Sequence, residues 1–265
     1  MIESDRRPIG IFDSGIGGLT VLKAIERILP QEHIIYFGDT ARVPYGNKSK
    51  QTVIRFSTEN ILFLLKKNVK IIVVACNTSS SLALDYLKKI FNIPVIGVID
   101  PAVQRAITVS QKKRIGIIGT KSTINSKVYE RKIMQKVKTA RVFSRECPLF
   151  VPFVEEGIVK GKIIDSLIQM YLEGLKGKVD TLILGCTHYP LLKPAISKYL
   201  KGVSLVDSAS AVAHQARGLL LEHNMLGNNA SSCKDFYVTD DSHTFKKLAK
   251  LFLKRHISKP KVINV

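Results

Sequence analysis

Tryptophan is absent from this chain of 265 residues, cysteine occurs only four times, and 21 acidic side chains face 41 Lys and Arg. No uncharged apolar run approaches the roughly 18 residues needed to cross a bilayer. The polar start, from Met1 to Pro8, lacks the apolar core of a signal peptide. No two cysteines have C-x-x-C spacing, which argues against a zinc site or a dense disulfide framework. These absences predict a soluble, cytoplasmic protein without a membrane segment or a bound metal.

The shortage of acids leaves a net charge of +20 that is unevenly spread. Residues 105–145 hold twelve Lys and Arg against the single acid Glu130, and residues 246–261 hold seven and no acid. A basic face of this kind can bind polyanions. No nucleic-acid motif and no interleaved aromatic residues accompany it, however. Solvated helix faces are the favoured interpretation, and no specific nucleic-acid partner is expected.

Short runs rich in Ile and Val alternate with helical patterns, which is typical of an α/β protein with a parallel sheet covered on both faces. The predicted strands are Ile9–Asp13, Ile34–Phe37, Ile71–Ala75, Val95–Val98, Arg114–Gly119, Val142–Phe143, Thr181–Gly185 and Ser204–Val206. The predicted helices are Leu19–Ile28, Lys50–Lys67, Ser80–Phe91, Asn125–Val137, Lys162–Leu175, Leu191–Leu200 and Ser210–His223. A loop is predicted over Asn224–Ser232.

An internal repeat divides the chain into two similar halves. The segment VVACNTSSSLALDYL (73–87) resembles LILGCTHYPLLKPAIS (182–197), and IGIFDS (9–14) resembles IGIIGT (115–120). Matching positions are 106 to 110 residues apart. We therefore expect two open, parallel-sheet, flavodoxin-like domains related by pseudo-twofold symmetry, with a site in the cleft between them. Residues 1–98 and 208–265 would form the first domain, and residues 99–207 the second.

The repeat places Cys76 and Cys186 at equivalent strand ends, each just before a predicted helix. Ligands of open α/β sheets bind outside the carboxyl ends of the strands. A helix N-terminus favours thiolate, so the pattern predicts a lowered pKa for both thiols. If the halves face each other, the thiols meet at one cleft. Cys147 and Cys233 lack this context and are interpreted as structural or incidental.

Two opposed thiols suit a reaction that inverts a stereocentre. One thiolate removes a proton from one face, and the other thiol supplies a proton to the opposite face. A disulfide would block both groups, and a redox pair usually has C-x-x-C spacing. The sequence thus favours racemisation over redox chemistry.

Polar groups near the other strand ends are candidates for substrate binding. The turn from Asp13 to Gly18 would offer backbone N–H groups to a carboxylate, but it lacks a full dinucleotide or P-loop motif. Asp13 would bind an ammonium, orient a base or simply cap the helix. The turn at Pro44-Tyr45-Gly46 would present further N–H groups. Donors also follow each cysteine: Asn77, Thr78, Thr187 and His188.

The sequence resembles the glutamate racemases over positions 9 to about 215. The motifs that carry this resemblance are FDSGIGGLTV (12–21), YFGDTARVPYG (36–46), ACNTSS (75–80), CPLFVPFVEEG (147–157), LGCTHYPLL (184–192) and VDSA (206–209). The resemblance implies a cofactor-independent enzyme with two α/β domains that interconverts L- and D-glutamate. It further implies that the D-glutamate enters peptidoglycan.

By the same resemblance, Cys76 and Cys186 are the acid/base pair, with Cys76 serving D-glutamate and Cys186 serving L-glutamate. The implied substrate-binding residues are Asp13, Ser14, Tyr45, Gly46, Asn77, Thr78, Thr187 and His188. Asp13, Glu155 and His188 are implied to assist the thiols. No cofactor and no metal are implied, and a homodimer is left open.

Two alternatives remain on the residues alone. One is an aspartate racemase of the same superfamily, although His188 and the Val43–Gly46 turn match the glutamate pattern better. The other is a binding protein, either a two-domain amino-acid receptor or a nucleic-acid binder that uses residues 105–145. Such a protein would not need paired thiols.

Overall fold

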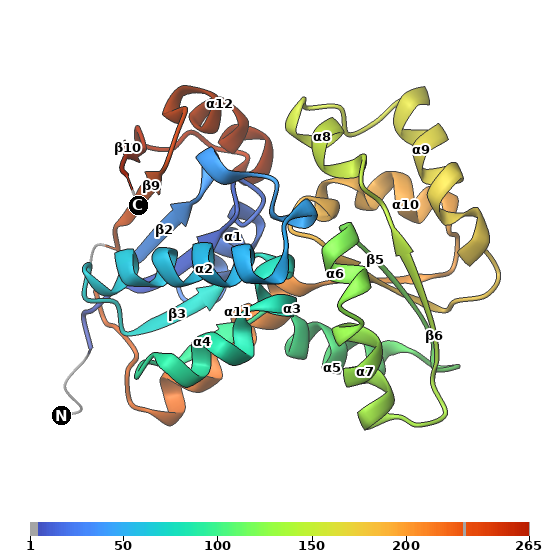
Figure 1. The fold of residues 1–265 in the computed structure, drawn as a ribbon, viewed down its shortest axis with the longest axis horizontal. Coiled ribbons are helices and arrows are strands. Elements are labelled where there is room, and N and C mark those ends of the chain that lie inside the picture. Colours follow the sequence, from blue (N-terminus) through green and yellow to red (C-terminus); the bar gives the residue numbers. More distant parts are fainter. Residues whose placement is uncertain (1–4, 230–231, 265) are drawn as a thin grey trace.

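Two α/β lobes lie side by side in the computed structural model, which describes residues 5–229 and 232–264 (Figure 1). The first lobe is built on a six-stranded sheet with the order β10-β9-β2-β1-β3-β4. The second is built on a four-stranded sheet with the order β6-β5-β7-β8. Every strand pair in both sheets is parallel. The predicted α/β class with two open parallel sheets is confirmed.

The strands of the first sheet are β1 (Ile9–Asp13), β2 (Ile34–Gly38), β3 (Ile71–Val74), β4 (Val95–Gly97), β9 (Lys234–Val238) and β10 (Lys261–Val262). Those of the second sheet are β5 (Arg114–Gly119), β6 (Arg141–Glu146), β7 (Thr181–Gly185) and β8 (Ser204–Asp207). Most residues of β1, β2, β3 and β7 are apolar and all are buried, as expected of strands covered on both faces.

The α-helices are α1 (Leu19–Ile28), α2 (Lys50–Leu65), α3 (Asn77–Leu82), α4 (Leu84–Ile90), α5 (Ile99–Val109), α6 (Lys121–Asn125), α7 (Val128–Lys136), α8 (Phe150–Glu155), α9 (Lys162–Leu172), α10 (Lys193–Tyr199), α11 (Ser208–Glu222) and α12 (Ser242–Leu253). Short 3-10 helices are η1 (Thr40–Arg42), η2 (Tyr45–Asn47), η3 (Glu173–Leu175) and η4 (Tyr189–Leu192). None of the helices in the described ranges is both long and apolar enough to span a bilayer.

The predicted duplication is visible in the strand order. The series β2-β1-β3-β4 in the first sheet corresponds to β6-β5-β7-β8 in the second. Ile9 of β1 pairs with Ile34 and Ile71, and Ile115 of β5 pairs with Val142 and Thr181. This order is that of flavodoxin-like sheets, whose ligands bind where the order reverses, beside the first strand.

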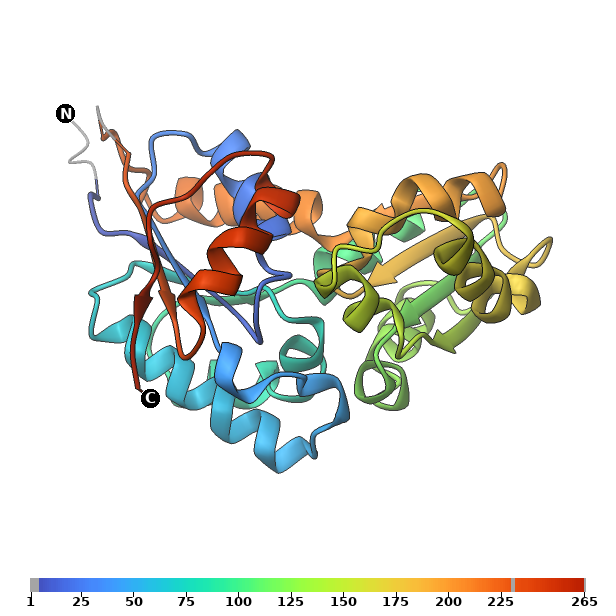
Figure 2. The same ribbon diagram turned by 90° about the horizontal axis from the view of Figure 1, so that it is seen from above.

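The end of the chain returns to the first lobe. β9 pairs with β2, and β10 pairs with β9. Seen from above in Figure 2, this orange-to-red segment lies beside the blue start of the chain. Helix α11 packs on α1 and also on α5, so it joins the two lobes behind the sheets. The predicted domain boundaries at 98/99 and 207/208 fall near these crossings and stay a prediction.

Several elements differ from the sequence prediction. The helix expected over Ser80–Phe91 begins earlier, because the Cys76 sulfur caps α3, and it is interrupted at Ala83. The helix expected over Asn125–Val137 is interrupted at Lys127, whose φ of 53° is left-handed. Helices α5, α8 and α12 and strands β9 and β10 were not predicted. The predicted loop at Asn224–Ser232 is confirmed where described, with residues 230–231 outside that range.

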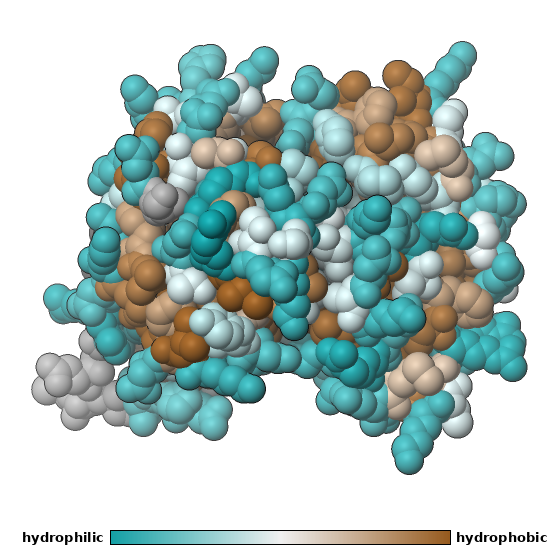
Figure 3. Space-filling view, in the orientation of Figure 1, coloured by the Kyte–Doolittle hydropathy of each residue, from teal (hydrophilic) through white to brown (hydrophobic). Residues whose placement is uncertain are grey.

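The surface in Figure 3 is mostly hydrophilic, with a brown area over the second lobe at the upper right. This is the side of α9, which carries the exposed side chains of Ile163 and Met170. Within the described residues, the buried apolar side chains form three clusters, one of which spans both lobes and includes Tyr36 and Leu184. Shared apolar packing therefore sets how the two lobes meet.

Candidate active site

The reversal points of both sheets face one another. β1 ends at Asp13 and β3 ends two residues before Cys76, while β5 and β7 end directly before Thr120 and Cys186. Between them lies a cavity of about 30 Å³ that both Cys76 and Cys186 line. Every predicted site residue except Asp13 lines it, and Asp13 lies directly behind the wall. The structure thus brings the predicted set together, with one thiol from each lobe.

Cys76 is the N-cap of α3. Its sulfur accepts a hydrogen bond from the Ser79 N–H at 3.5 Å and lies 3.7 Å from the Ser14 hydroxyl oxygen. Burial makes the largest contribution to the pKa of the Cys76 thiol, and the neighbouring Asp13 carboxylate the next largest. Together they raise this pKa to about 11. The expectation of a lowered pKa is therefore wrong at Cys76, because desolvation outweighs the helix N-terminus.

Cys186 has a different partner. Its sulfur lies 3.7 Å from His188 Nδ1, and His188 Nε2 lies 2.9 Å from Glu155 Oε1. Burial opposes the charged form of His188, but Cys186 and Glu155 together raise its pKa to about 10. This raised pKa favours the protonated, cationic form of the imidazole. The residues after Cys186 form the 3-10 turn η4 before α10 begins. Unlike Cys76, Cys186 therefore does not cap an α-helix, contrary to the prediction that each cysteine lies just before a helix.

Asp13 links the two lobes from a fully buried position. One carboxylate oxygen accepts a hydrogen bond from the Gly15 N–H at 3.2 Å, and the other accepts from the Thr187 hydroxyl at 3.4 Å. Burial raises the pKa of Asp13. Thr20 makes a second link, because its hydroxyl donates to the Thr187 carbonyl at 3.1 Å.

The turn that contains Tyr45 and Gly46 closes another side of the cavity. The Tyr45 hydroxyl donates to Asp39 and accepts from Asn60 Nδ2 at 3.2 Å, and burial raises its pKa. These bonds direct the hydroxyl toward the first lobe. The rest of Tyr45, its ring and backbone, is then what can line the cavity. Gly46 faces Thr120 so closely that a Cβ at position 46 would lie 2.7 Å from the Thr120 Cβ.

Asn77 and Thr78 contribute polar groups beside Cys76. Tyr129 donates to Asn77 Oδ1 at 2.6 Å, while the buried Asn77 Nδ2 has no partner among the described residues. Thr78 Oγ1 lies 3.1 Å from Thr120 Oγ1 and 3.3 Å from Thr123 Oγ1. An unpaired buried donor is costly, so Asn77 is suited to bind an anionic ligand.

Some residues of the cavity were not named individually as site residues, namely Val43, Pro44, Thr120 and Val151, although Val43 and Pro44 belong to the turn that the sequence singled out. Thr120 had a signal, because it occupies the repeat position of Ser14. Val151 lies within the CPLFVPFVEEG motif (147–157), but the helix α8 that carries it was not predicted. In residues 5–229 and 232–264, no group of three or more His, Cys, Asp and Glu side chains could hold a metal ion.

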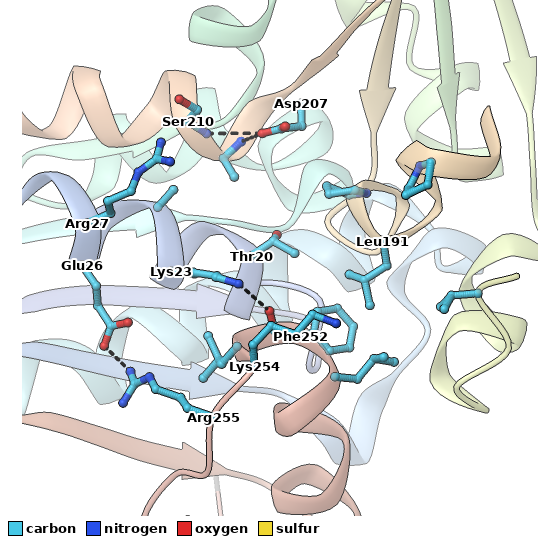
Figure 4. Close-up of a pocket in the computed structure, with 17 residues that line it drawn as sticks. Thr20, Lys23, Glu26, Arg27, Leu191, Asp207, Ser210, Phe252, Lys254 and Arg255 are labelled. Atoms are coloured by element: carbon cyan, nitrogen blue, oxygen red, sulfur yellow. Dashed lines mark hydrogen bonds and ion pairs between the residues drawn. The ribbon is translucent and has the colours of Figure 1, made fainter. Parts of the chain in front are cut away.

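A larger cavity of about 760 Å³ is lined by residues that include Lys23, Leu191 and Phe252 (Figure 4). Lys23 of α1 donates to the Phe252 carbonyl at 3.5 Å, and Arg255 lies 2.5 Å from Glu26. The Phe252 ring packs edge-on against His188 with centroids 5.8 Å apart. Neither cysteine sulfur lines this cavity. It borders the site but lacks the site's reactive groups.

Comparisons with known proteins agree on one family. Residues 9–216 match the family described as Asp/Glu/Hydantoin racemase. The glutamate racemase of Aquifex pyrophilus is 51% identical over 247 residues, or 93% of this chain and 94% of that protein. That of Aquifex aeolicus is 49% identical over 254 residues, or 96% of each. A crystal structure of glutamate racemase from Francisella tularensis in complex with D-glutamate has a TM-score of 0.92 at 41% identity, with 98% of both chains covered.

Proposed function

The chain belongs to the Asp/Glu/Hydantoin racemase family, and we propose that, as a glutamate racemase, it moves the Cα proton of glutamate between two opposed thiols, Cys76 and Cys186. The observation that supports this assignment is that Cys76 and Cys186 come from different lobes and line the same cavity. The D-glutamate that this enzyme class makes is used for peptidoglycan.

From L-glutamate, the Cys186 thiolate takes the Cα proton, so a C–H bond breaks and an S–H bond forms. The electron pair stays on the substrate as a carbanion delocalised into the α-carboxylate. The Cys76 thiol then gives its proton to the opposite face, which leaves D-glutamate and a Cys76 thiolate. The reverse reaction starts from that state. The raised pKa of Cys76 favours the thiol that the first direction requires.

The Cα proton is a weak acid, so the site must stabilise the carbanion. Hydrogen bonds to the α-carboxylate are strong in a cavity that excludes water. Asn77 Nδ2 is a buried donor without a partner in the described chain, and Thr78 and Thr120 add hydroxyls. The protonated His188 stabilises a negative sulfur at Cys186. The proposal needs no metal and no organic cofactor.

Glutamate cannot enter the cavity as it stands. A volume of about 30 Å³ has room for only one or two water molecules. The lobes must therefore part for substrate to enter and close again to exclude water. Contacts that must break include the bond from the Ser122 hydroxyl to the Gly46 carbonyl, 2.7 Å long, and the bond from Thr20 to Thr187.

The proposal also has consequences for location and assembly. Both thiols must stay reduced to carry protons, which fits the cytoplasm. Each lobe supplies one thiol to the same cavity, so one chain holds a complete site. A homodimer is therefore compatible with the mechanism but not required by it.

Isotope transfer tests the mechanism. Wild-type protein is incubated with L-glutamate in D2O, and both enantiomers are analysed for deuterium at Cα at early times. The D-product should carry deuterium from its first formation, because Cys76 delivers a solvent-derived proton. The recovered L-substrate should gain label much more slowly. Transfer of the original proton into the product, or equal labelling of both enantiomers, would indicate a single base.

A further inference from the structure

The loop that joins β2 to α2, residues 39–49, supplies four consecutive cavity residues, Val43 to Gly46. It consists of the short 3-10 turns η1 and η2 and their connections. Its internal backbone bonds include Arg42 N–H to the Asp39 carbonyl at 3.2 Å and Lys48 N–H to the Tyr45 carbonyl at 3.0 Å. Backbone groups of the loop also bond to other elements: the Asp39 N–H donates to the Asp13 carbonyl at 3.1 Å, and the Gly46 carbonyl accepts from the Ser122 hydroxyl. Side-chain bonds add to this hold on the turn.

Asp39 is the side chain on which the loop converges. Its carboxylate is fully buried. Oδ2 accepts hydrogen bonds from Arg42 Nε at 2.7 Å and from the Tyr45 hydroxyl. Oδ1 accepts from the Thr239 hydroxyl at 3.0 Å. A buried carboxylate requires such compensation, so these donors hold the loop and the C-terminal segment in one geometry.

Helix α2 supports the same group from the other side. Arg42 forms an ion pair with Glu59 and donates to Asn60 Oδ1 at 2.9 Å, and its guanidinium lies 4.2 Å from the Phe56 ring centroid. Asn60 Nδ2 in turn donates to the Tyr45 hydroxyl. Tyr45 is thereby fixed through bonds that point away from the cavity.

Thr239 follows β9 and connects this loop to the end of the chain. Its hydroxyl donates to Asp39 and accepts from the Ala41 N–H at 2.8 Å. Beside it, the Thr40 hydroxyl donates to the Asp240 carbonyl at 2.6 Å and accepts from the Asp240 N–H at 2.8 Å. Thr239 itself does not line the catalytic cavity. Any effect of Thr239 on the substrate must act through Asp39 and the loop.

We propose that Asp39 and Thr239 are positioning residues for racemisation, an inference that rests on the proposed function. Asp39 places the turn from Val43 to Gly46 against the substrate, and Thr239 holds Asp39 in that place. Neither residue touches the reacting atoms. A small displacement of the turn weakens the hold on a substrate carboxylate and so weakens substrate binding.

The test uses Thr239→Val, which keeps the side-chain shape and removes the hydroxyl. We expect KM for both L- and D-glutamate to rise about tenfold while kcat changes less than about threefold, because the turn binds substrate and transition state alike. Thr239→Ser retains the hydroxyl and should restore KM to within about twofold of wild type. The matched control is Thr108→Val in α5, whose exposed hydroxyl bonds to the Gln104 carbonyl, and it should change neither constant.

The outcomes separate the two proposals. An unchanged KM in folded Thr239→Val protein overturns the positioning role while leaving the proposed function intact. A lower kcat at constant KM reports a smaller active fraction and also overturns it. Failure of the wild-type protein to racemise glutamate overturns the proposed function itself.

Tyr45→Phe provides a second test if Thr239→Val does not fold. This variant removes only the hydroxyl that donates to Asp39, so we expect KM to rise with little change in kcat. Where both variants fold, the double variant should raise KM by less than the product of the two single effects, because both act through Asp39. A product of independent effects would contradict the shared junction, as would an unchanged KM in Tyr45→Phe.

Discussion

Cys76 and Cys186 lie at equivalent strand ends of two sheets with the same strand order, yet their surroundings differ. Cys76 is buried next to the carboxylate of Asp13, and both effects raise the pKa of its thiol to about 11. Cys186 lies beside the imidazole of His188, whose pKa of about 10 keeps it positively charged. Glu155 holds that imidazole from the other side. The surroundings of Cys76 thus favour the neutral thiol, whereas the Cys186 sulfur lies beside an imidazole whose cationic form is favoured.

This comparison separates two contributions to the site. The repeated strand order positions the thiols, because a cysteine after β3 and a cysteine after β7 meet where both sheets reverse. The side chains that are not repeated make the two thiols differ, because Asp13 lies beside Cys76 and His188 lies beside Cys186. A symmetric fold can therefore hold two chemically identical groups in different surroundings.

The largest effect is expected from the thiols themselves. Cys76→Ser and Cys186→Ser should each lower racemisation by about 10³-fold or more in both directions, because a hydroxyl is a far poorer base. The comparison is sharpened by proton exchange in D2O. Cys76→Ser should still exchange the Cα proton of L-glutamate alone, and Cys186→Ser that of D-glutamate alone. Near wild-type racemisation by either variant would exclude the two-thiol mechanism.

Cys147→Ser is the matched control for these substitutions. Cys147 is buried but does not line the catalytic cavity. The racemase activity of Cys147→Ser should stay close to that of wild type. Its thermal unfolding should shift to lower temperature, because a hydroxyl replaces a buried sulfur.

The next effect concerns the cation beside Cys186. His188→Asn should lower kcat/KM by about 10²-fold, because the sulfur loses its charged partner. Ser14→Ala, beside Cys76, should lower kcat/KM only a few fold, since the Ser14 hydroxyl is neutral and its oxygen lies 3.7 Å from the Cys76 sulfur. Steady-state kinetics in both directions measure the two variants. Equal losses would mean that the two thiols do not differ as their surroundings indicate.

A smaller effect is expected where the lobes touch. A Cβ at Gly17 would lie 2.3 Å from Thr187 Oγ1 and 2.5 Å from His188 Nδ1. Gly17→Ala should therefore prevent full closure and lower kcat/KM by about 10-fold to 10²-fold. Gly218→Ala in α11, where a Cβ meets no atom within 4 Å, is the control. It should stabilise the helix by about 0.5–1 kcal/mol and leave activity unchanged. Wild-type activity in Gly17→Ala would show that close contact at Thr187 and His188 is dispensable.

Much of this arrangement was readable in the sequence. Buried strands show as Ile- and Val-rich runs, and the repeat pairs Cys76 with Cys186 without any structure. Thr120 was equally readable as the partner of Ser14 but was not assigned to the site. Its role, like those of the other site residues, remains a prediction.

Other features depend on tertiary contacts that no local pattern reports. The lowered pKa predicted for Cys76 failed because the depth of burial is set by the packing of both lobes. The bond from Thr239 to Asp39 joins positions 200 residues apart. The contact of Phe252 with His188 depends on α12, which was not predicted at all.

The last prediction uses pH to test the asymmetry. Groups with raised pKa values keep their protons to higher pH, so the active state, with His188 charged and Cys76 neutral, persists at neutral pH and is lost as pH rises through about 10. We expect kcat/KM for L-glutamate to fall on this basic side. Glu155→Gln removes a carboxylate that raises the pKa of His188, so the fall should begin at lower pH. At a fixed pH near 9, kcat/KM of Glu155→Gln should therefore lie up to about tenfold below that of wild type. A pH profile of Glu155→Gln that coincides with the wild-type profile would show that Glu155 does not control the charge beside Cys186.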